Sequence, residues 1–108
     1  MIKIPVRNVA KQKFSIEIEP ESLIFNFDFL YNSRAKLFYM DLALGNDEVL
    51  KGIGAVSGIE LLSQFNLIQG DLVVLNSAEY SGDPTLGSWD NATEMFYFEK
   101  SELEQLSL

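Results

Sequence analysis

Phe14-Ser15-Ile16-Glu17-Ile18-Glu19 places an apolar residue at every second position and a polar residue between each pair. Successive side chains of a β-strand point to opposite faces, so this period of two predicts a strand with one face against a core and the other in water. The same alternation recurs on both sides, at residues 2–7, 25–31 and 37–44. The dominant pattern is therefore that of strands and not of helices.

Turn residues separate these predicted strands. Gly45-Asn46-Asp47 follows the stretch 37–44 and supplies residue types that tolerate the positive φ of hairpin turns. Further strands are expected at residues 48–53, 71–76 and 95–99. Residues 59–65 instead carry apolar side chains at helical spacing. We therefore expect an all-β fold, an antiparallel β-sandwich or barrel of about seven strands with one short helical insert at residues 59–65.

A single domain is expected over residues 1–108, because a chain of 108 residues with 47% hydrophobic residues has the size and composition of one domain with one core. Pro5 removes a backbone donor from the first strand, which should therefore lie at a sheet edge. Near the other end, Ser101 and Glu104 have the spacing of a helix N-cap and its reciprocal partner. Residues 101–108 are expected to form a short C-terminal helix or a docking tail.

The composition excludes several kinds of chemistry. The chain has no Cys and no His, which removes disulfides, thiolate nucleophiles, Ser-His-Asp triads and the usual zinc ligands. We expect no cofactor. No stretch reaches the roughly 20 apolar positions of a transmembrane helix, and the first residues lack the apolar core of a signal peptide, so a soluble, unprocessed protein is expected.

Charge is unevenly distributed along the chain. The formal net charge is -8, which argues against a general nucleic-acid binder because phosphates are neutralised by a basic surface. Residues 1–14 nevertheless hold four basic residues and no acid, whereas residues 15–108 hold four basic residues against sixteen acidic ones. The sequence thus predicts a basic leading strand on an acidic body, which could form a solvated strand face or dock on an acidic neighbour.

Two patterns that could carry chemistry are weak. The glycines of residues 52–58 do not have the spacing of a dinucleotide-binding or phosphate-binding loop, and strand bends and tight turns explain them more simply. Asp83 with Asp90, and Asp41 with Glu48, are the carboxylate pairs that could act as acid and base. Because carboxylates on loops of an acidic protein are usually solvated, we expect neither catalysis nor a functional metal site there.

Residues 77–94 form a long segment rich in Gly, Ser, Asp, Asn and Pro. Loops of this length are uncommon in compact domains and are often functional. Trp89 in this loop is equally compatible with anchoring a partner and with covering one end of its own fold. The candidate interface residues come from the leading segment, the long loop and the C-terminal tail: Lys3, Arg7, Lys11, Lys13, Tyr80, Asp83, Trp89, Leu103 and Leu106.

The order of several short motifs resembles that of a family of small phage proteins. The matching segments are Ile4-Pro5-Val6, Phe14-Ser15-Ile16, Tyr39-Met40-Asp41-Leu42, Leu50-Lys51-Gly52, Gly58-Ile59-Glu60-Leu61-Leu62, Gly70-Asp71-Leu72, Asp83-Pro84-Thr85, Leu86-Gly87 and Met95-Phe96-Tyr97-Phe98. Together they cover roughly residues 2–99 and are similar to the baseplate plug family of contractile-tailed phages, known from cyanophages.

The resemblance implies a structural virion protein of the tail baseplate and no enzyme. It would bridge or seal the tail hub and tube region through contacts with hub, tube or wedge proteins, in several copies per particle, and would be present in the host cytoplasm during assembly. It implies no nucleic-acid and no membrane partner. The alternative is a small β-barrel ligand-binding module, perhaps for carbohydrate, in which Tyr80 and Trp89 form a stacking platform.

Overall fold

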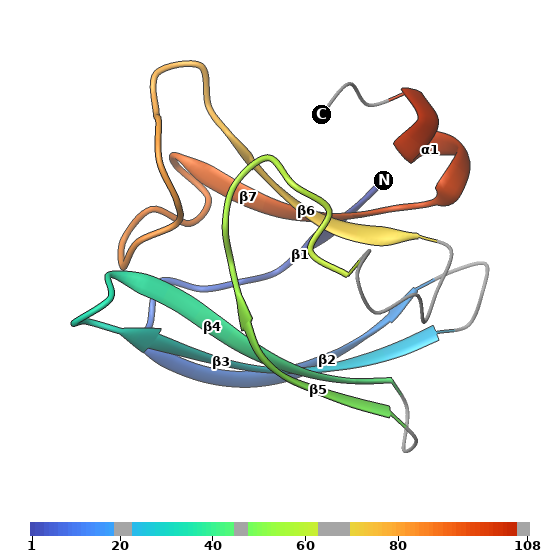
Figure 1. Cartoon of the computed structure of the whole chain (residues 1–108), viewed down its shortest axis with the longest axis horizontal. Helices are drawn as coiled ribbons and strands as arrows, with labels where there is room; N and C mark the ends of the chain where they lie inside the picture. Colours follow the sequence, from blue (N-terminus) through green and yellow to red (C-terminus); the bar gives the residue numbers. More distant parts are fainter. Residues whose placement is uncertain (19–22, 45–47, 63–69, 106–108) are drawn as a thin grey trace.

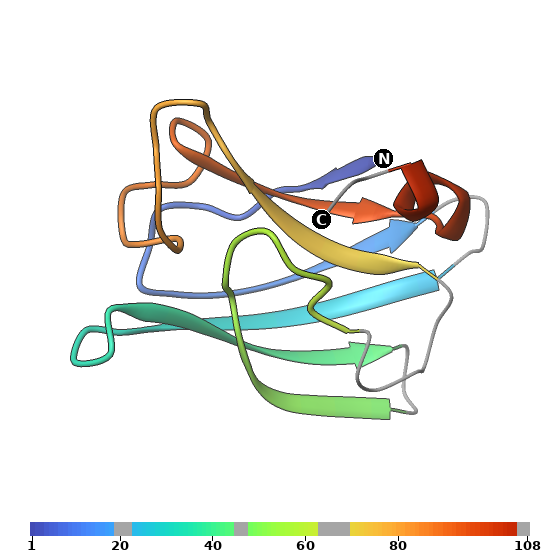
Figure 2. The same cartoon turned by 45° about the horizontal axis from the view of Figure 1, so that its top comes forward.

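The computed structural model describes residues 1–18, 23–44, 48–62 and 70–105. Within them the chain forms two antiparallel sheets that face each other (Figures 1 and 2). The elements are β1 (Ile2–Ile4), β2 (Lys11–Ile18), β3 (Leu23–Asn32), β4 (Leu37–Leu44), β5 (Glu48–Gly54), β6 (Asp71–Asn76), β7 (Thr93–Phe98) and α1 (Lys100–Gln105). The sheets have the strand orders β1-β7-β6 and β2-β3-β4-β5. The predicted all-β sandwich is confirmed, and the sheets do not close into a barrel.

The expected helical insert at residues 59–65 is only partly within the described residues. Leu61 and Leu62 form a turn, and Ile59 and Glu60 belong to no regular element, so the described part is not helical. The remaining residues, 63–65, lie outside the described residues. The one helix among the described residues is α1, near the other end of the chain.

Alternation along the strands builds the core. In β4 the side chains of Phe38, Met40 and Leu42 are buried, whereas the residues between them are half-buried. The inward residues of β2 and β3 meet across the strand pair, with Phe14 opposite Phe27 and their ring centroids 5.1 Å apart. The inner faces of the two sheets pack against each other through aromatic and aliphatic side chains, which form one core from which water is excluded.

One edge of the three-stranded sheet is short, and the other is covered. β1 has three residues, pairs with β7 alone and is followed directly by Pro5, so the edge position predicted from this proline is confirmed. On the other edge, the segment after β5 runs along β6: the N–H of Gly58 donates to the Val74 carbonyl at 2.9 Å and that of Leu61 to the Leu72 carbonyl at 3.0 Å. An edge protected in this way does not recruit other chains.

The glycines of residues 52–58 serve the backbone, as predicted. Gly52 has φ +70° beside an irregularity in the β4–β5 register, and its N–H donates to Asp41 Oδ1 at 2.9 Å. Gly58 has φ +77° where the chain turns onto β6. Such positive φ values cost other residues energy but not glycine. Among the described residues, no helix is long and apolar enough to cross a membrane.

Gly70, which precedes β6, is required for a different reason, the lack of space. A Cβ at this position would lie 2.2 Å from the Tyr97 hydroxyl oxygen and 2.5 Å from the Phe98 carbonyl oxygen. We expect Gly70→Ala to lower the free energy of unfolding by about 1–3 kcal/mol, because β6 must move away from β7. Denaturant unfolding measures this. Gly54→Ala is the control, since its Cβ would meet the flexible end of Leu37 at 3.2 Å and the Tyr39 ring at an ordinary contact distance of 3.8 Å. An equal loss in both variants would contradict the prediction.

Asp71 is a buried carboxylate at the start of β6. Its Oδ1 accepts the N–H groups of Leu62 at 2.6 Å and Leu72 at 2.7 Å. Burial, only partly offset by these hydrogen bonds, raises the pKa of Asp71 to about 6. The carboxyl group therefore fixes the turn at Leu62 onto β6, although burial disfavours its ionised form.

The raised pKa predicts how stability depends on pH. Since the pKa in the folded protein exceeds the value of about 3.9 in an unfolded chain, the contribution of Asp71 is complete below pH 4 and is lost as the pH rises through about 6. Asp71→Asn keeps an oxygen acceptor without the charge. Relative to this variant, we expect the free energy of unfolding of the parent to fall by on the order of 2 kcal/mol between pH 4 and pH 7. Parallel pH profiles of the two proteins would contradict this.

Candidate interface surfaces

Trp89 closes one end of the sandwich from within. It lies in the long loop between β6 and β7 and is only 1% exposed. Its ring makes edge-on contacts with Phe29 and Phe38 of the four-stranded sheet, at centroid distances of 6.4 and 5.7 Å. Of the two roles that the sequence leaves open, the structure shows the second, in which the ring covers the end of its own fold. A stacking platform that uses the face of Trp89 is therefore not present on the surface.

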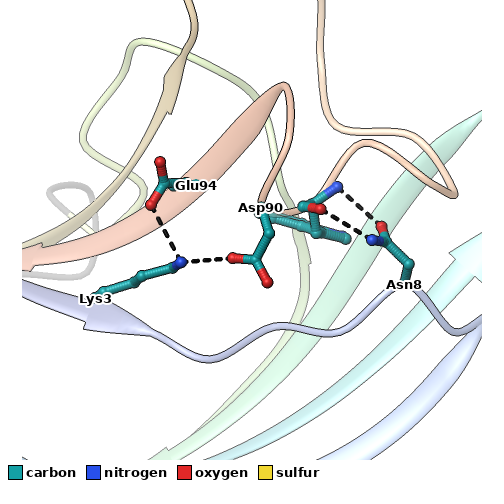
Figure 3. A network of polar contacts seen from close by, with 5 residues as sticks. Lys3, Asn8, Asp90 and Glu94 are labelled. Atoms are coloured by element: carbon teal, nitrogen blue, oxygen red, sulfur yellow. Dashed lines mark hydrogen bonds and ion pairs between the residues drawn. The ribbon is translucent and has the colours of Figure 1, made fainter.

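Asn8 holds the loop in this position. Its side-chain amide pairs with the backbone of Trp89 on both sides: Nδ2 donates to the Trp89 carbonyl and Oδ1 accepts the Trp89 N–H, each at 2.9 Å (Figure 3). The amide thus gives the loop backbone the two hydrogen bonds that a neighbouring strand would otherwise supply. It joins the connection between β1 and β2 to a residue that lies 81 positions away in the sequence.

The basic leading strand docks on the molecule's own acidic residues. Lys3 Nζ lies 2.6 Å from Asp90 Oδ1 and 3.3 Å from Glu94 Oε2, so that the ammonium group is held between the loop and β7 (Figure 3). The hydrogen bond to Asp90, followed by that to Glu94, raises the pKa of Lys3. Lys13 Nζ is 3.7 Å from Asp28 on the neighbouring strand. Two of the four predicted basic contact residues thus already have acidic partners within the chain.

The loop between β6 and β7 is also fixed at its first half. Asp83 Oδ1 accepts the N–H of Ser57 at 2.9 Å, and the Tyr80 hydroxyl donates to the Asp83 carbonyl at 2.8 Å. The Asn76 side chain donates to the Gly82 carbonyl at 2.8 Å. Tyr80 and Asp83 therefore form one cluster with the turn after β5, and this cluster is separate from the Asn8–Trp89 contact.

The C-terminal helix packs near the N-terminus. The ammonium group of Met1 forms an ion pair with Glu102, and this contact lowers the pKa of the Glu102 carboxyl group. Glu102 also accepts the N–H of Glu99 at 2.9 Å, while Leu103 donates to the Glu99 carbonyl at 2.9 Å. The N-cap is therefore Glu99 and not Ser101, because the helix starts directly after β7. Leu103 is half-buried, and Leu106 lies outside the described residues.

The outer face of the four-stranded sheet carries a feature that the sequence did not single out. A hollow of about 450 Å³ opens on this face, between side chains that include Lys13, Ser15, Asp28, Asp41 and Ala43. We call this surface the outer sheet face. Asp28 and Asp41 lie directly opposite each other on β3 and β4. The alternation in residues 25–31 and 37–44 could have located it, because the residues that lie between core positions along a strand must point outward.

A second, smaller hollow lies beside the first on the outer sheet face. It has a volume of about 260 Å³ and is lined by Lys11, Asp28, Leu30, Tyr39 and Asp41. Leu30 is 54% exposed and Ile24 on the same strand 48% exposed. A surface on which exposed apolar residues lie between charged ones is suited to contact with another protein.

Among the described residues, no group of three potential metal ligands lies together. Asp83 binds the backbone of Ser57, and Asp90 binds Lys3, and both residues are exposed. Asp71 is buried, but it is occupied by two backbone donors. The polar contacts of these residues hold the chain in place.

These observations define a structural interaction module: a small antiparallel sandwich whose long loop and helix are held on its own body. Comparison with known families agrees. The family model described as the cyanophage baseplate Pam3 plug gp18 matches residues 1–100. The chain belongs to this family of baseplate plug proteins, so it is a structural component of a phage tail baseplate and acts there with other baseplate proteins. No curated protein gives a significant match.

The Asn8–Trp89 pairing leads to a testable prediction. Asn8→Ala should lower the free energy of unfolding by about 1–3 kcal/mol, since it removes two hydrogen bonds and leaves the backbone groups of Trp89 without partners. Thermal and denaturant unfolding measure the loss. Asn91→Ala in the same loop removes one exposed hydrogen bond to the Gly87 carbonyl and should cost below about 0.5 kcal/mol. If the two variants are equally stable, Asn8 does not hold the loop.

Proposed function

We propose that this protein is a plug-type part that bridges or seals the hub and tube region of the tail baseplate through protein–protein contacts, and that it is not an enzyme. The family supports a role in the baseplate. The observation that carries the more specific proposal is that the long loop, the first strand and the helix are all held on the body of the molecule. Trp89 fills the end of its own sandwich, and Lys3 and Glu102 tie the first strand and the helix to the body. A part that is already rigid loses little conformational entropy when it is fitted between neighbours.

The outer sheet face is the surface that we assign to these contacts. It presents the hollow of about 450 Å³ beside the exposed Leu30, and its charges include both signs, Lys13 against Asp28 and Asp41. A neighbouring hub, tube or wedge protein could insert a side chain into this hollow and complement the carboxylates around it. Arg7 and Lys11 are exposed, have no ion pair within the described part of the chain, and extend the available surface.

Several copies would be built into each particle in a symmetric arrangement, after the protein is made in the host cytoplasm. No contact with nucleic acid or with a membrane is part of this role. Repeated copies of one part around a tail axis meet equivalent neighbours, so a single contact surface serves every copy. The carbohydrate-binding alternative loses its main support because the Trp89 ring is buried.

Ala43→Arg tests the assigned surface. Ala43 lines the hollow on β4 and points away from the core, so an arginine there should fill the hollow and leave the fold intact. We expect the variant to be lost from assembled tails, with incorporation reduced about tenfold or more relative to the parent, as quantified by mass spectrometry of purified particles. Ala78→Arg, at an exposed loop position, introduces the same side chain elsewhere and should be incorporated normally.

Circular dichroism and thermal unfolding of both purified variants establish that each is folded. Normal incorporation of a folded Ala43→Arg protein would show that the outer sheet face is not the contact surface. The bridging or sealing role itself is tested by cryo-electron microscopy of tails made with and without the protein. Density for it away from the hub and tube, or unaltered closure of that region in its absence, would contradict the role.

A further inference from the structure

β2 is an edge strand of the four-stranded sheet, and none of the described strands pairs with its outer side. It is eight residues long and pairs with β3 alone. The N–H of Tyr31 donates to the Ala10 carbonyl at 2.7 Å, in the same register as the β2–β3 ladder. In an antiparallel pair, hydrogen-bonded and non-hydrogen-bonded positions alternate, so the even-numbered residues of β2 bond to β3. The backbone groups of Lys11, Lys13, Ser15 and Glu17 consequently point out of the sheet.

These outward backbone groups have no hydrogen-bond partner within the residues that the structure describes. The contrast with β6 is clear, because the segment that includes Gly58 and Leu61 covers that edge. β5 carries the register irregularity at Gly52, which interrupts its edge. β2 is therefore the longest regular edge in the described structure, and long regular edges recruit further strands.

The outward side chains of β2 determine which partner strand can pair with this edge. Those on its outer face read Lys11, Lys13, Ser15 and Glu17, all of them exposed. When a second copy of the strand is laid antiparallel with its centre at Phe14, Lys11 of each copy lies opposite Glu17 of the other, and Lys13 lies opposite Ser15. All four of these positions have outward backbone groups, so charge pairing and hydrogen bonding agree in this register.

Other registers of the same pair are less favourable. A slip by one residue sets residues whose backbone groups point out of the sheet opposite residues whose backbone groups point back to β3, so the inter-strand hydrogen bonds cannot form. A slip by two residues in one direction places Lys13 opposite Lys13 of the other copy. The opposite slip sets Lys13 opposite Glu17 but Ser15 opposite Ser15, and it leaves Lys11 without a partner inside β2, which ends at Ile18.

The core side of the edge favours the same arrangement. Phe14 and Ile16 are only partly buried although both pack against the core. In the register centred on Phe14, the two Phe14 residues face each other at a non-hydrogen-bonded position, where cross-strand side chains are closest. The pairing thus shields two half-exposed apolar side chains from water in each copy.

We propose that a second copy of this chain docks on β2, in an antiparallel two-fold pairing centred on Phe14, which joins the two four-stranded sheets into one. The contact is isologous, so it closes after two copies and produces pairs instead of open chains. It is a property of the isolated protein and goes beyond the proposed role in the baseplate, so that either can fail without the other.

Charge reversal tests the pairing in the purified full chain. Glu17→Lys sets two lysines opposite Lys11 and Lys11→Glu sets two glutamates opposite Glu17, so each should weaken dimerisation about tenfold or more in sedimentation equilibrium. The combined variant exchanges the charges and should restore the dissociation constant to within about threefold of the parent. Glu79→Lys and Lys100→Glu, at exposed positions away from β2, change the net charge equally and should have no effect.

Cross-linking tests the register. The chain contains no Cys, so introduced cysteines are the only thiols. An equimolar mixture of Lys13→Cys and Ser15→Cys proteins should form a mixed disulfide on mild oxidation, because the paired Cα atoms are about 5.5 Å apart at a hydrogen-bonded position. Each variant alone should cross-link at least about tenfold more slowly, since its two thiols are then diagonal to each other.

Four outcomes would overturn the proposal. They are a protein that stays monomeric up to millimolar concentration, a dimer that the charge reversals do not weaken, failure of the combined variant to recover pairing, and efficient cross-linking of either cysteine variant with itself. Circular dichroism of every variant verifies the fold. If a charge reversal unfolds the chain, the mixed cross-link, which changes only exposed side chains, still decides the question.

Discussion

The burial of Trp89 against Phe29 and Phe38 is the contact on which the rest of the structure depends. A two-sheet sandwich is open at its ends, where water would otherwise reach the inner aromatic residues. Here the long loop between β6 and β7 turns its tryptophan ring inward and closes the end. The ring is effective only if the loop holds it, and the paired hydrogen bonds from Asn8 do so without a covalent link. A protein without cysteine can thus keep an irregular segment of this length in one conformation.

Several charged groups of this molecule form ion pairs with each other, which leaves fewer charges for contacts with a partner. The net charge of -8 describes an acidic surface, but Lys3 is held by Asp90 and Glu94, and the Met1 ammonium by Glu102. Exposed ion pairs of this kind contribute little to stability, so their main effect is to orient the leading strand and the helix. What remains for neighbours is a face with charges of both signs around a hollow, together with an edge strand.

The fold could be predicted from the sequence because strand alternation is a local signal, and each of the seven strands carried it or was bounded by turn residues. The position of Trp89 could not, since a loop aromatic residue is compatible with facing inward or outward. Asn8 left no local trace either: its partner is the backbone of a residue 81 positions away. Ser101 is the better capping residue by type, yet the strand before it ends at Phe98, and the helix begins too early for Ser101 to cap it.

The pairing of β1 with β7 has a consequence for how the protein is made. β2, β3, β4 and β5 are joined in sequence order, so their sheet is assembled from neighbouring segments as the chain grows. Ile2, by contrast, pairs with Tyr97, and the three-stranded sheet cannot be completed until β7 has left the ribosome. Loop closure over that distance must be offset by contacts that form late. β1, which is synthesised before the other described strands, therefore finds its partner last, and until then the sheet of β2–β5 lacks the sheet that covers its core face.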